Sequence, residues 1–418
     1  MITKYLLIKL LSFVFFVFSI GIVKAQTAVD YYSIGGIVKD SRSKKAIEYV
    51  NVSAKGTNIG TVTNADGEFV LKLYDSLFVK EIELSCIGYF NVKINISKNM
   101  EQNQTYYITP QIYTINNAEV LGWKTPRDLV ELAMKKVNEN YSMKPNMLTG
   151  FYRETIQKRR SYICISEAVI QVYKTAYNHN ADNDRSQVIK GRKLVSPKKN
   201  DTLDVKFLGG PNILIFLDVV KNPDILLSKD YLYCYSYTMG EATSIDERLH
   251  YVVNFKPQVI LDYPLYSGTL YIDKETFVFT RAELSMDMSD RAKVIKDILV
   301  SKPQGLRFVP EEITTVVTYK QLSGKTRLNY IRNEIRFKCD WRRKLFATNY
   351  TIINEVVITD IEENNVTQIP TKSMFSARKS LSQEVTAYYD ENFWGAYNII
   401  EPTESLENAV NKLKKRQK

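Results

Sequence analysis

The two histidines of the chain, His179 and His250, are the residues best suited to metal or proton-transfer chemistry. A zinc peptidase site needs two histidines and a glutamate on the metal, with a general base beside it. Neither histidine begins an H-x-x-E or H-E-x-x-H pattern. His179 lies in the polar run 177–180, and His250 precedes the apolar run 251–253. We therefore expect one exposed loop histidine, one strand-end histidine and no metal site.

Four cysteines, Cys86, Cys164, Cys234 and Cys339, stand far apart and form no C-x-x-C pair. This spacing argues against zinc and thioredoxin-like sites. Exported proteins form disulfides, so pairing stays open. Cys86 and Cys164 alternate with apolar neighbours, however, as small core residues do. We expect buried thiols, with disulfides as the alternative.

Other reactive patterns are missing from the sequence. No G-x-S-x-G nucleophile elbow occurs, and the turn 64–67 lacks the ligand series that follows in a calcium loop. We therefore expect no catalytic residue, no cofactor and no bound metal, and we expect that the protein is not an enzyme. A hydrolase of unknown class stays an alternative, because sequence alone cannot place pairs of carboxylates in space.

An aromatic cluster near the C-terminus consists of Phe393, Trp394 and Tyr397. Aromatic side chains stack on sugars and peptides, and they also fill cores. We treat these three residues as the candidate ligand or partner contacts, with packing beneath the last turn of the chain as the alternative.

Residues 1–25 have the order of a secretory signal peptide. Lys4 and Lys9 precede the apolar run 10–23, and Ala25 offers a small residue before Gln26. An uncleaved anchor is the alternative, but the run is shorter than the ~20 residues that span a bilayer. We expect an exported protein, periplasmic or outer-membrane-associated, with no transmembrane helix after signal cleavage.

The net charge of +11 is a weak guide to partners. Three of the lysines, Lys4, Lys9 and Lys24, belong to the expected signal peptide. In an exported protein the remaining positive charge favours an anionic envelope surface. We expect no nucleic acid partner.

Residues 31–110 read as short strands separated by turns. Every second side chain is apolar in 50–54, 69–73, 82–86 and 92–96, which is typical of strands buried on one face. Glycine-containing turns separate them. Several short strands at close spacing predict an Ig- or prealbumin-like β-sandwich.

The same region resembles a known family in the segments 36–40, 46–52, 56–69 and 86–89. They resemble the carboxypeptidase regulatory-like domain of exported Bacteroidetes proteins, including many TonB-dependent transporters. The resemblance implies an accessory sandwich and no peptidase activity. It also makes an accessory component of a TonB-dependent transport system an alternative. A transporter barrel itself has some 22 strands, too many for the remaining residues.

A linker at 111–124 precedes the second domain, 125–418. Thr125 and Pro126 supply a helix cap and a first-turn proline, and apolar residues at helical spacing follow to Val137. A second helix is expected to open at 209–212 and carry 213–220.

Most of the second domain reads as an antiparallel meander. The expected strands are 151–155, 163–173, 231–237, 251–255, 268–273, 277–286, 308–321, 329–337 and 350–361. Such a sheet must bury one face against helices or curl on itself, so we predict a half-open barrel around a helix. The hairpin of 268–276 with 281–284 resembles lipoprotein-carrier-like folds. A final helix follows Pro402, and its basic end either docks on an anionic surface or closes the fold.

These expectations favour a non-catalytic binding or assembly protein of the cell envelope. The partners expected are an envelope protein or outer-membrane complex, and lipid or glycan. A carrier of a lipid or another hydrophobic ligand in the half-barrel is an alternative; an open apolar concave face would favour it, and a filled one would oppose it.

Overall fold

The computed structural model describes residues 30–101, 103–111, 123–198, 201, 203, 205–207, 209–342, 346–376, 379–385 and 393–417. The expected signal peptide, 1–25, and most of the expected linker, 111–124, lie outside these residues. Strands predominate in the described part, so the mainly β prediction is confirmed. No helix in that part is both long enough and apolar enough to span a membrane.

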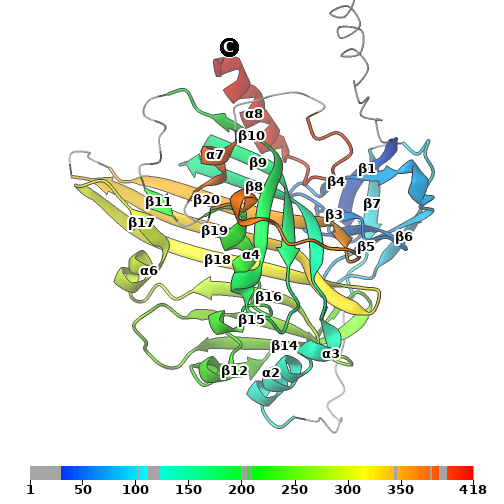
Figure 1. The fold of residues 1–418 in the computed structure, drawn as a ribbon, viewed down its shortest axis with the longest axis horizontal. Helices are drawn as coiled ribbons and strands as arrows, with labels where there is room; N and C mark the ends of the chain where they lie inside the picture. Colours follow the sequence, from blue (N-terminus) through cyan, green and yellow to red (C-terminus); the bar gives the residue numbers. More distant parts are fainter. Residues whose placement is uncertain are drawn as a thin grey trace, which may run out of the picture.

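The N-terminal domain consists of two small β-sheets (Figure 1). One has the order β4(Glu68–Tyr74)-β1(Tyr31–Asp40)-β7(Gln104–Ile108), and the other β3(Gly60–Val62)-β2(Asn51–Ala54)-β5(Glu81–Ser85)-β6(Val92–Asn95). The 3-10 turn η1(Asp75–Leu77) follows β4. Ile34 and Leu71 from the first sheet share one buried cluster with Leu84 from the second. This packing makes the domain a sandwich.

The turn between β3 and β4 is built on Asn64. Its Oδ1 accepts the backbone N–H groups of Asp66 and Glu68, at 2.9 Å each. The Asn64–Gly67 run is therefore a turn, as its residue types indicate, but it is not a hairpin turn, because it leads from one sheet of the sandwich to the other.

The second domain is built on one eleven-stranded antiparallel sheet. Its order is β10-β9-β8-β20-β19-β18-β16-β15-β14-β12, with β13 paired to β14. The bounds are β8(Asn146–Lys158), β9(Ser161–Lys174), β10(Arg185–Val195), β12(Tyr235–Met239), β13(Thr243–Ile245), β14(Arg248–Pro257), β15(Tyr266–Asp273), β16(Phe279–Met286), β18(Leu306–Leu322), β19(Lys325–Trp341) and β20(Thr348–Glu362).

The order of the sheet is not that of a simple meander. Strand β8, early in the domain, pairs with β20, its last long strand, from the Lys158–Tyr350 pair to the Met147–Glu362 pair. In a simple meander β10 would lie next to the strand that follows it. Here the β8-β9-β10 unit instead lies on the far side of β20, with β10 at the edge of the sheet.

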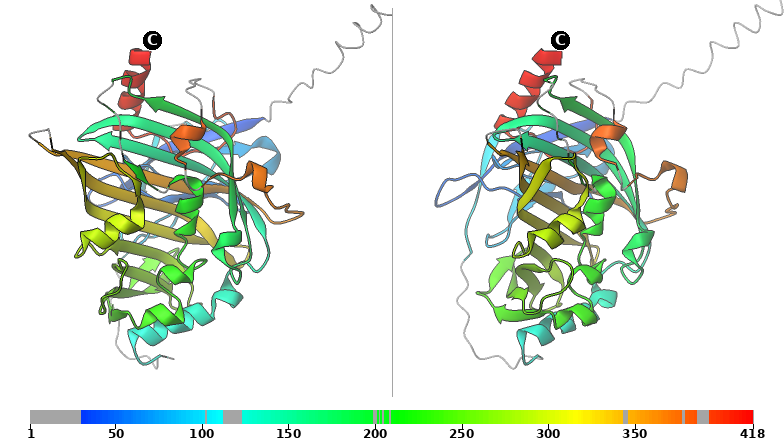
Figure 2. Two further views of the ribbon diagram at one scale, coloured as in Figure 1. Left: turned by 60° about the vertical axis from the view of Figure 1, so that its left-hand side comes forward. Right: turned by 90° about the vertical axis from the view of Figure 1, so that its left-hand side faces the viewer.

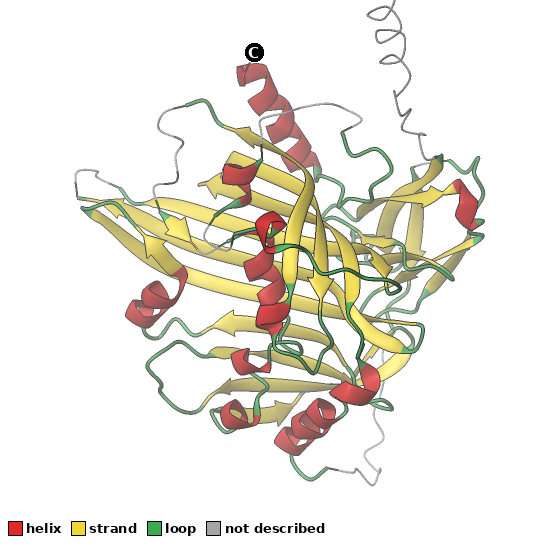
Figure 3. Cartoon of the chain, viewed as in Figure 1, coloured by secondary structure: helices red, strands yellow, loops and turns green. Residues whose placement is uncertain are grey.

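Most of the helices cover one face of this sheet, which curves around them (Figures 2 and 3). The C-terminal helix, 404–417, packs on the opposite face against Ile165 and Leu194. The helices of the second domain are α2(Pro126–Lys135), α3(Val137–Asn140), α4(Gly210–Phe216), α5(Lys229–Leu232), α6(Arg291–Ile298), α7(Leu381–Glu384) and α8(Glu404–Gln417), with 3-10 turns η2(Ala181–Asn183), η3(Pro223–Ile225) and η4(Thr371–Ser373). The two-stranded sheet β11(Lys206–Phe207)-β17(Leu299–Ser301) completes the fold. The predicted half-barrel wrapped around helices is confirmed.

The first helix begins where its capping residues predict. Thr125 Oγ1 accepts the N–H of Asp128 at 3.2 Å, and the Asp128 carboxylate accepts the N–H of Thr125 at 2.9 Å. Leu129, Val130 and Ala133 form the buried face. This reciprocal capping satisfies N–H groups that a helix start leaves unpaired.

Two local predictions were wrong. Residues expected to begin a strand at 231–237 form the end of α5 instead, since the N–H of Leu232 bonds to Ser228 O at 3.1 Å and the strand begins only at Tyr235. The helix expected to reach 220 ends at Phe216. The chain leaves it because the fully buried Asp218 accepts from Tyr177 and Tyr319, at 3.1 and 2.7 Å.

The N-terminal domain packs on the convex face of the large sheet, opposite α2 and α4. Val62 of β3 shares a buried cluster with Phe151 and Tyr330 of the sheet. Strand neighbours Tyr152 and Ile331 belong to the core under the helices. Because successive side chains of a strand point to opposite faces, the two clusters lie on opposite sides of the sheet.

The C-terminal segment 393–404 holds the two domains together. Asn398 bonds to both backbone groups of Lys72, at 2.7 and 3.1 Å. Thr61 Oγ1 donates to Ile399 O at 2.9 Å, and Asn64 Nδ2 donates to Pro402 O at 3.1 Å. Residues more than 300 positions apart are thereby fixed against one another.

A buried charge network lies beneath this segment. Arg153 Nε bonds to Glu167 Oε1 at 2.9 Å, and its Nη1 lies 3.4 Å from Glu355 Oε1. Its Nη2 donates to Ile400 O. Burial alone would raise the pKa of Glu167, but Arg153 and Arg192 hold that pKa below its ordinary value. The network therefore keeps its charges in a site that excludes water.

We expect Arg153→Met to lower the free energy of unfolding by about 3–5 kcal/mol, because it removes the buried cation that pairs with both Glu167 and Glu355 and that donates to Ile400 O. Arg336→Met is the control, since Arg336 is about half exposed and its ion pairs are screened; it should cost under about 1 kcal/mol. Urea unfolding of both variants measures the difference. Equal losses would show that the Arg153 network does not hold the interface.

Candidate functional site

A row of polar side chains crosses the concave face of the sheet. In the strand register, Ser166 faces Glu154, Glu154 faces Asn354, Asn354 faces Asn333, and Asn333 faces Thr315. Directly paired residues point to the same side of a sheet. The pairing therefore aligns one polar residue from each of β9, β8, β20, β19 and β18.

Apolar rows flank this polar row on both sides. Each apolar row lies two residues away from the polar row along the strands. One row consists of Ile156, Ile352, Ile335 and Ile313, and the other of Tyr152, Val356, Ile331 and Val317. The first set belongs to the core near α6 and the β11-β17 pair, the second to the core under α2 and α4. Polar groups thus lie in the middle of an apolar wall.

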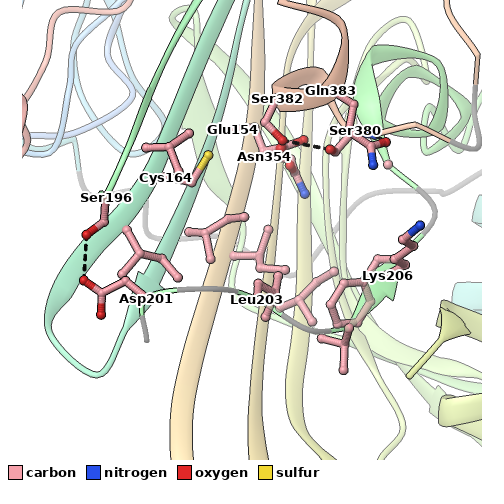
Figure 4. A pocket seen from close by; sticks show the side chains of 18 residues that line it. Glu154, Cys164, Ser196, Asp201, Leu203, Lys206, Asn354, Ser380, Ser382 and Gln383 are labelled. Atoms are coloured by element: carbon pink, nitrogen blue, oxygen red, sulfur yellow. Dashed lines mark hydrogen bonds between the residues drawn. The ribbon is translucent and has the colours of Figure 1, made fainter. Parts of the chain in front are cut away.

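Two cavities open on this wall. The first has a volume of about 350 Å³ and is lined by Glu154, Asn354 and residues of α7 and β11 (Figure 4). The second has a volume of about 370 Å³ and reaches to α4 and α6. Both are lined by Phe207, Gly209, Ile335 and Asn354, so they adjoin. The concave face is open, and its lining is mostly apolar.

Glu154 is the charged group at the centre of this site. Its side chain lies beside the amide of Asn354 and under Ser382 of α7 (Figure 4). The residue is only 4% exposed, and its Oε1 has no hydrogen-bond partner among the described residues. Burial raises the pKa of Glu154 to about 7, against the hydrogen bonds of the Leu381 N–H and the Tyr152 hydroxyl. Glu154 is therefore poised to exchange a proton near neutral pH.

Tyr152 links the two acceptors of the row. Its hydroxyl lies 3.4 Å from Glu154 Oε2 and 3.2 Å from Asn354 Oδ1. A phenol has one proton, so it donates to one of them at a time. Further along, Asn333 Nδ2 donates to Thr315 Oγ1 at 2.9 Å. Asn333 and Thr315 thus pair with each other at one end of the row, and at the other end Glu154 Oε1 has no partner among the described residues.

Cys164, Ser380 and Ser382 line the first cavity but are poor nucleophiles there. Cys164 lines the first cavity, where burial raises the pKa of its thiol to about 11. Ser380 and Ser382 hydroxyls bond to each other at 2.9 Å. A buried thiol of high pKa is a poor nucleophile.

The two histidines lie outside the cavities. His179 is exposed, as expected. His250 is the third residue of β14 and is buried; its Nδ1 lies 2.8 Å from Arg248 O and its Nε2 3.9 Å from Asp273. Burial lowers the pKa of His250. Within the described ranges no group of three or more His, Cys, Asp or Glu side chains is arranged to hold a metal.

No disulfide joins the four cysteines in the described part of the chain. Cys164, Cys234 and Cys339 are buried, and Cys86 is half-buried. Burial raises the pKa of Cys86 to about 11.

The aromatic cluster of the C-terminal segment lies on the other face of the sheet. Phe393 and Trp394 are 6% and 5% exposed, and the Trp394 ring meets Phe151 edge-on at 5.3 Å. The Arg192 guanidinium stacks 4.8 Å from Trp394. Tyr397 packs half-buried against the same cluster. The structure thus places these three residues in the contact between the domains and away from the cavities.

The sequence analysis did not single out Glu154 and Asn354. A signal was present, because Glu154 shares its alternation with Tyr152 and Ile156, and Asn354 with Ile352 and Val356. A polar residue in the apolar phase of a strand points into the core, where polar groups are rare. Only the β8–β20 pairing shows that the two stand side by side.

Comparison with known proteins identifies the N-terminal domain. Residues 34–121 match the family model of the CarboxypepD_reg-like domain. The chain therefore carries a CarboxypepD_reg-like domain. It is this domain that packs on the convex face of the half-barrel. A search of curated proteins finds no match.

Solved structures resemble the chain only distantly. One match is a putative outer membrane lipoprotein-sorting protein domain from Vibrio parahaemolyticus, 11% identical, with a TM-score of 0.28 over 58% of this chain and 95% of that one. Another is a DUF1329 family protein from Desulfovibrio piger, 12% identical, with a TM-score of 0.24 over 58% and 93%. Both TM-scores are below 0.5, so the architecture of the second domain rests on its own sheet topology.

We expect Glu154→Gln to be more stable than the wild type at pH 8, and about equal to it at pH 4. The pKa of the folded state lies above the ordinary value, so stability is present at low pH and is lost as pH rises through 7. The relative gain is on the order of 3 kcal/mol. Urea unfolding at a series of pH values measures it. Glu362→Gln, on an exposed residue of β20, controls for the lost charge; an equal gain in that variant would contradict the assignment to Glu154.

Proposed function

We propose that this chain is a non-catalytic binding protein of the bacterial cell envelope, and that it carries a ligand with an apolar body in the half-barrel. The observation that carries the proposal is the pair of adjoining cavities on the concave face. Their volumes of about 350 and 370 Å³ fall in the usual range of ligand sites, ~300–1,000 Å³. Isoleucines of the sheet line them, together with residues of β11, α4 and α7.

The side chains of the cavities support binding without turnover. Cys164 is held as a thiol, Ser380 and Ser382 bond to each other, and Glu154 has no histidine beside it in the lining. Acyl transfer needs a nucleophile with an adjacent base and a group that orients the base. The lining offers hydrogen-bonding groups in an apolar wall, which suits recognition.

The envelope location is supported by the sequence of residues 1–25, which has the order of a secretory signal peptide. The CarboxypepD_reg-like domain supports a second role, assembly with an envelope protein or outer-membrane complex. That domain exposes large apolar residues, among them Phe78 at 83% and Tyr107 at 47%. Exposed aromatic residues are enriched in protein contacts.

Native mass spectrometry of the protein purified from its own envelope tests the carrier role. We expect an added mass that organic extraction releases as a small molecule with an apolar body. Finding only the unliganded chain, in protein that also fails to take up a fluorescent alkyl probe, would contradict it.

A larger side chain in the shared wall of the cavities should weaken uptake of the probe. Ile335 lines both cavities, and we expect Ile335→Phe to weaken binding of the probe N-phenyl-1-naphthylamine about tenfold or more, because the larger ring occupies the ligand's space. Arg336→Phe is the matched control, since the next residue of β19 points to the other face. Equal effects of the two changes would place the probe elsewhere.

A further inference from the structure

We infer that the first cavity selects ligands whose apolar chain bears a hydrogen-bond donor, a hydroxyl, amide N–H or ammonium group, and that Glu154 is its acceptor. This inference rests on the proposed carrier function and specifies the chemistry of its ligand.

The unpaired oxygen of Glu154 is the first ground. Buried polar atoms in proteins almost always have partners, and an unpaired one is costly. Glu154 Oε1 is buried without a hydrogen-bond partner among the described residues, and the same carboxyl lines the first cavity. A donor brought by a ligand would supply the missing partner.

The balance of donors and acceptors around Glu154 is the second ground. Glu154 Oε2 and Asn354 Oδ1 compete for the single proton of the Tyr152 hydroxyl. The next amide in the row, Asn333, donates from its Nδ2 to Thr315 Oγ1 and Thr314 O. Glu154 Oε1 therefore remains without a donor, which a ligand's hydroxyl, amide N–H or ammonium group would supply.

The surrounding wall defines the rest of the ligand. Ile156, Ile352 and Ile335 line the cavity beside the polar row, so a chain lying on them buries apolar surface while its donor reaches Glu154. An anionic head group at this point would stand against a carboxyl that already lacks a cation in its shell. Like charges in a buried site repel, so a carboxylate head is disfavoured here.

Competition against N-phenyl-1-naphthylamine with dodecyl compounds tests the inference in the full-length protein. We expect 1-dodecanol to bind about tenfold or more tightly than 1-methoxydodecane, which has the same chain but no donor. In Glu154→Leu the preference should vanish while the ether still binds. That variant should fold, because an apolar side chain of similar size replaces a buried carboxyl whose Oε1 has no hydrogen-bond partner among the described residues.

Two further variants sharpen the test. Glu154→Gln keeps an acceptor oxygen and loses the charge, so it should retain the alcohol if the site recognises a neutral donor. Selective loss of dodecylamine in Glu154→Gln would show that the site also takes an ammonium group. Glu362→Leu, on an exposed residue of the same sheet, should keep the wild-type preference.

The outcomes separate the inference from the function on which it rests. Equal binding of alcohol and ether, or a preference that survives in Glu154→Leu, overturns the donor selectivity and leaves the carrier function standing. If no dodecyl compound and no probe binds the wild type, the carrier function fails and the inference fails with it.

Discussion

The antiparallel pairing of β8 with β20 is the constraint on which the rest of the structure depends. It joins the first long strand of the second domain to its last, so that β9 and β10 extend the sheet on the far side. One register sets both faces. On the concave side it places Glu154 opposite Asn354. On the convex side, one residue earlier on β8 and one residue later on β20, it places Arg153 opposite Glu355. A shift of one residue would exchange the two faces.

The buried Arg153 is paired on the convex face of the sheet, and the buried Glu154 is incompletely paired on the concave face. On the convex face Arg153 meets Glu167, Glu355 and the Ile400 carbonyl, and the C-terminal segment seals the group under the CarboxypepD_reg-like domain. On the concave face Glu154 has a phenol and an amide near it and keeps one oxygen unpaired. A paired charge contributes to a fixed interface, whereas an unpaired one beside a cavity is suited to meet a ligand.

The C-terminal segment gives the chain its rigidity between domains. Phe393 and Trp394 pack between the sandwich and the sheet. The Asn398 side chain bonds to the backbone N–H and C=O of Lys72 in the edge strand β4, as a neighbouring strand would. Its place explains why aromatic residues gather near the end of the sequence. The same composition suits stacking on a ligand, and only the fold shows that these rings are enclosed by protein.

Local periodicity made much of the architecture accessible from the sequence. Alternation at 50–54 and 82–86 predicted strands that became β2 and β5, and Thr125 with Pro126 predicted the start of α2. These signals depend on neighbours within a few residues, where backbone geometry and side-chain direction are coupled. The match to the CarboxypepD_reg-like domain also lies in short turns and strands.

The site was decided by tertiary structure. Glu154 and Asn354 are 200 positions apart, and nothing in either strand's own pattern names the other as its partner. Loop closure and the burial of two apolar faces choose the register, and these are properties of the whole chain. For the same reason, the end of α4 at Phe216 followed from the distant Tyr177 and Tyr319, which hold Asp218. The sequence by itself determined the β-rich class, the sandwich and the capped helix; the tertiary structure decided the cavities and their acceptor, because side chains far apart in the chain meet only when the sheet has formed.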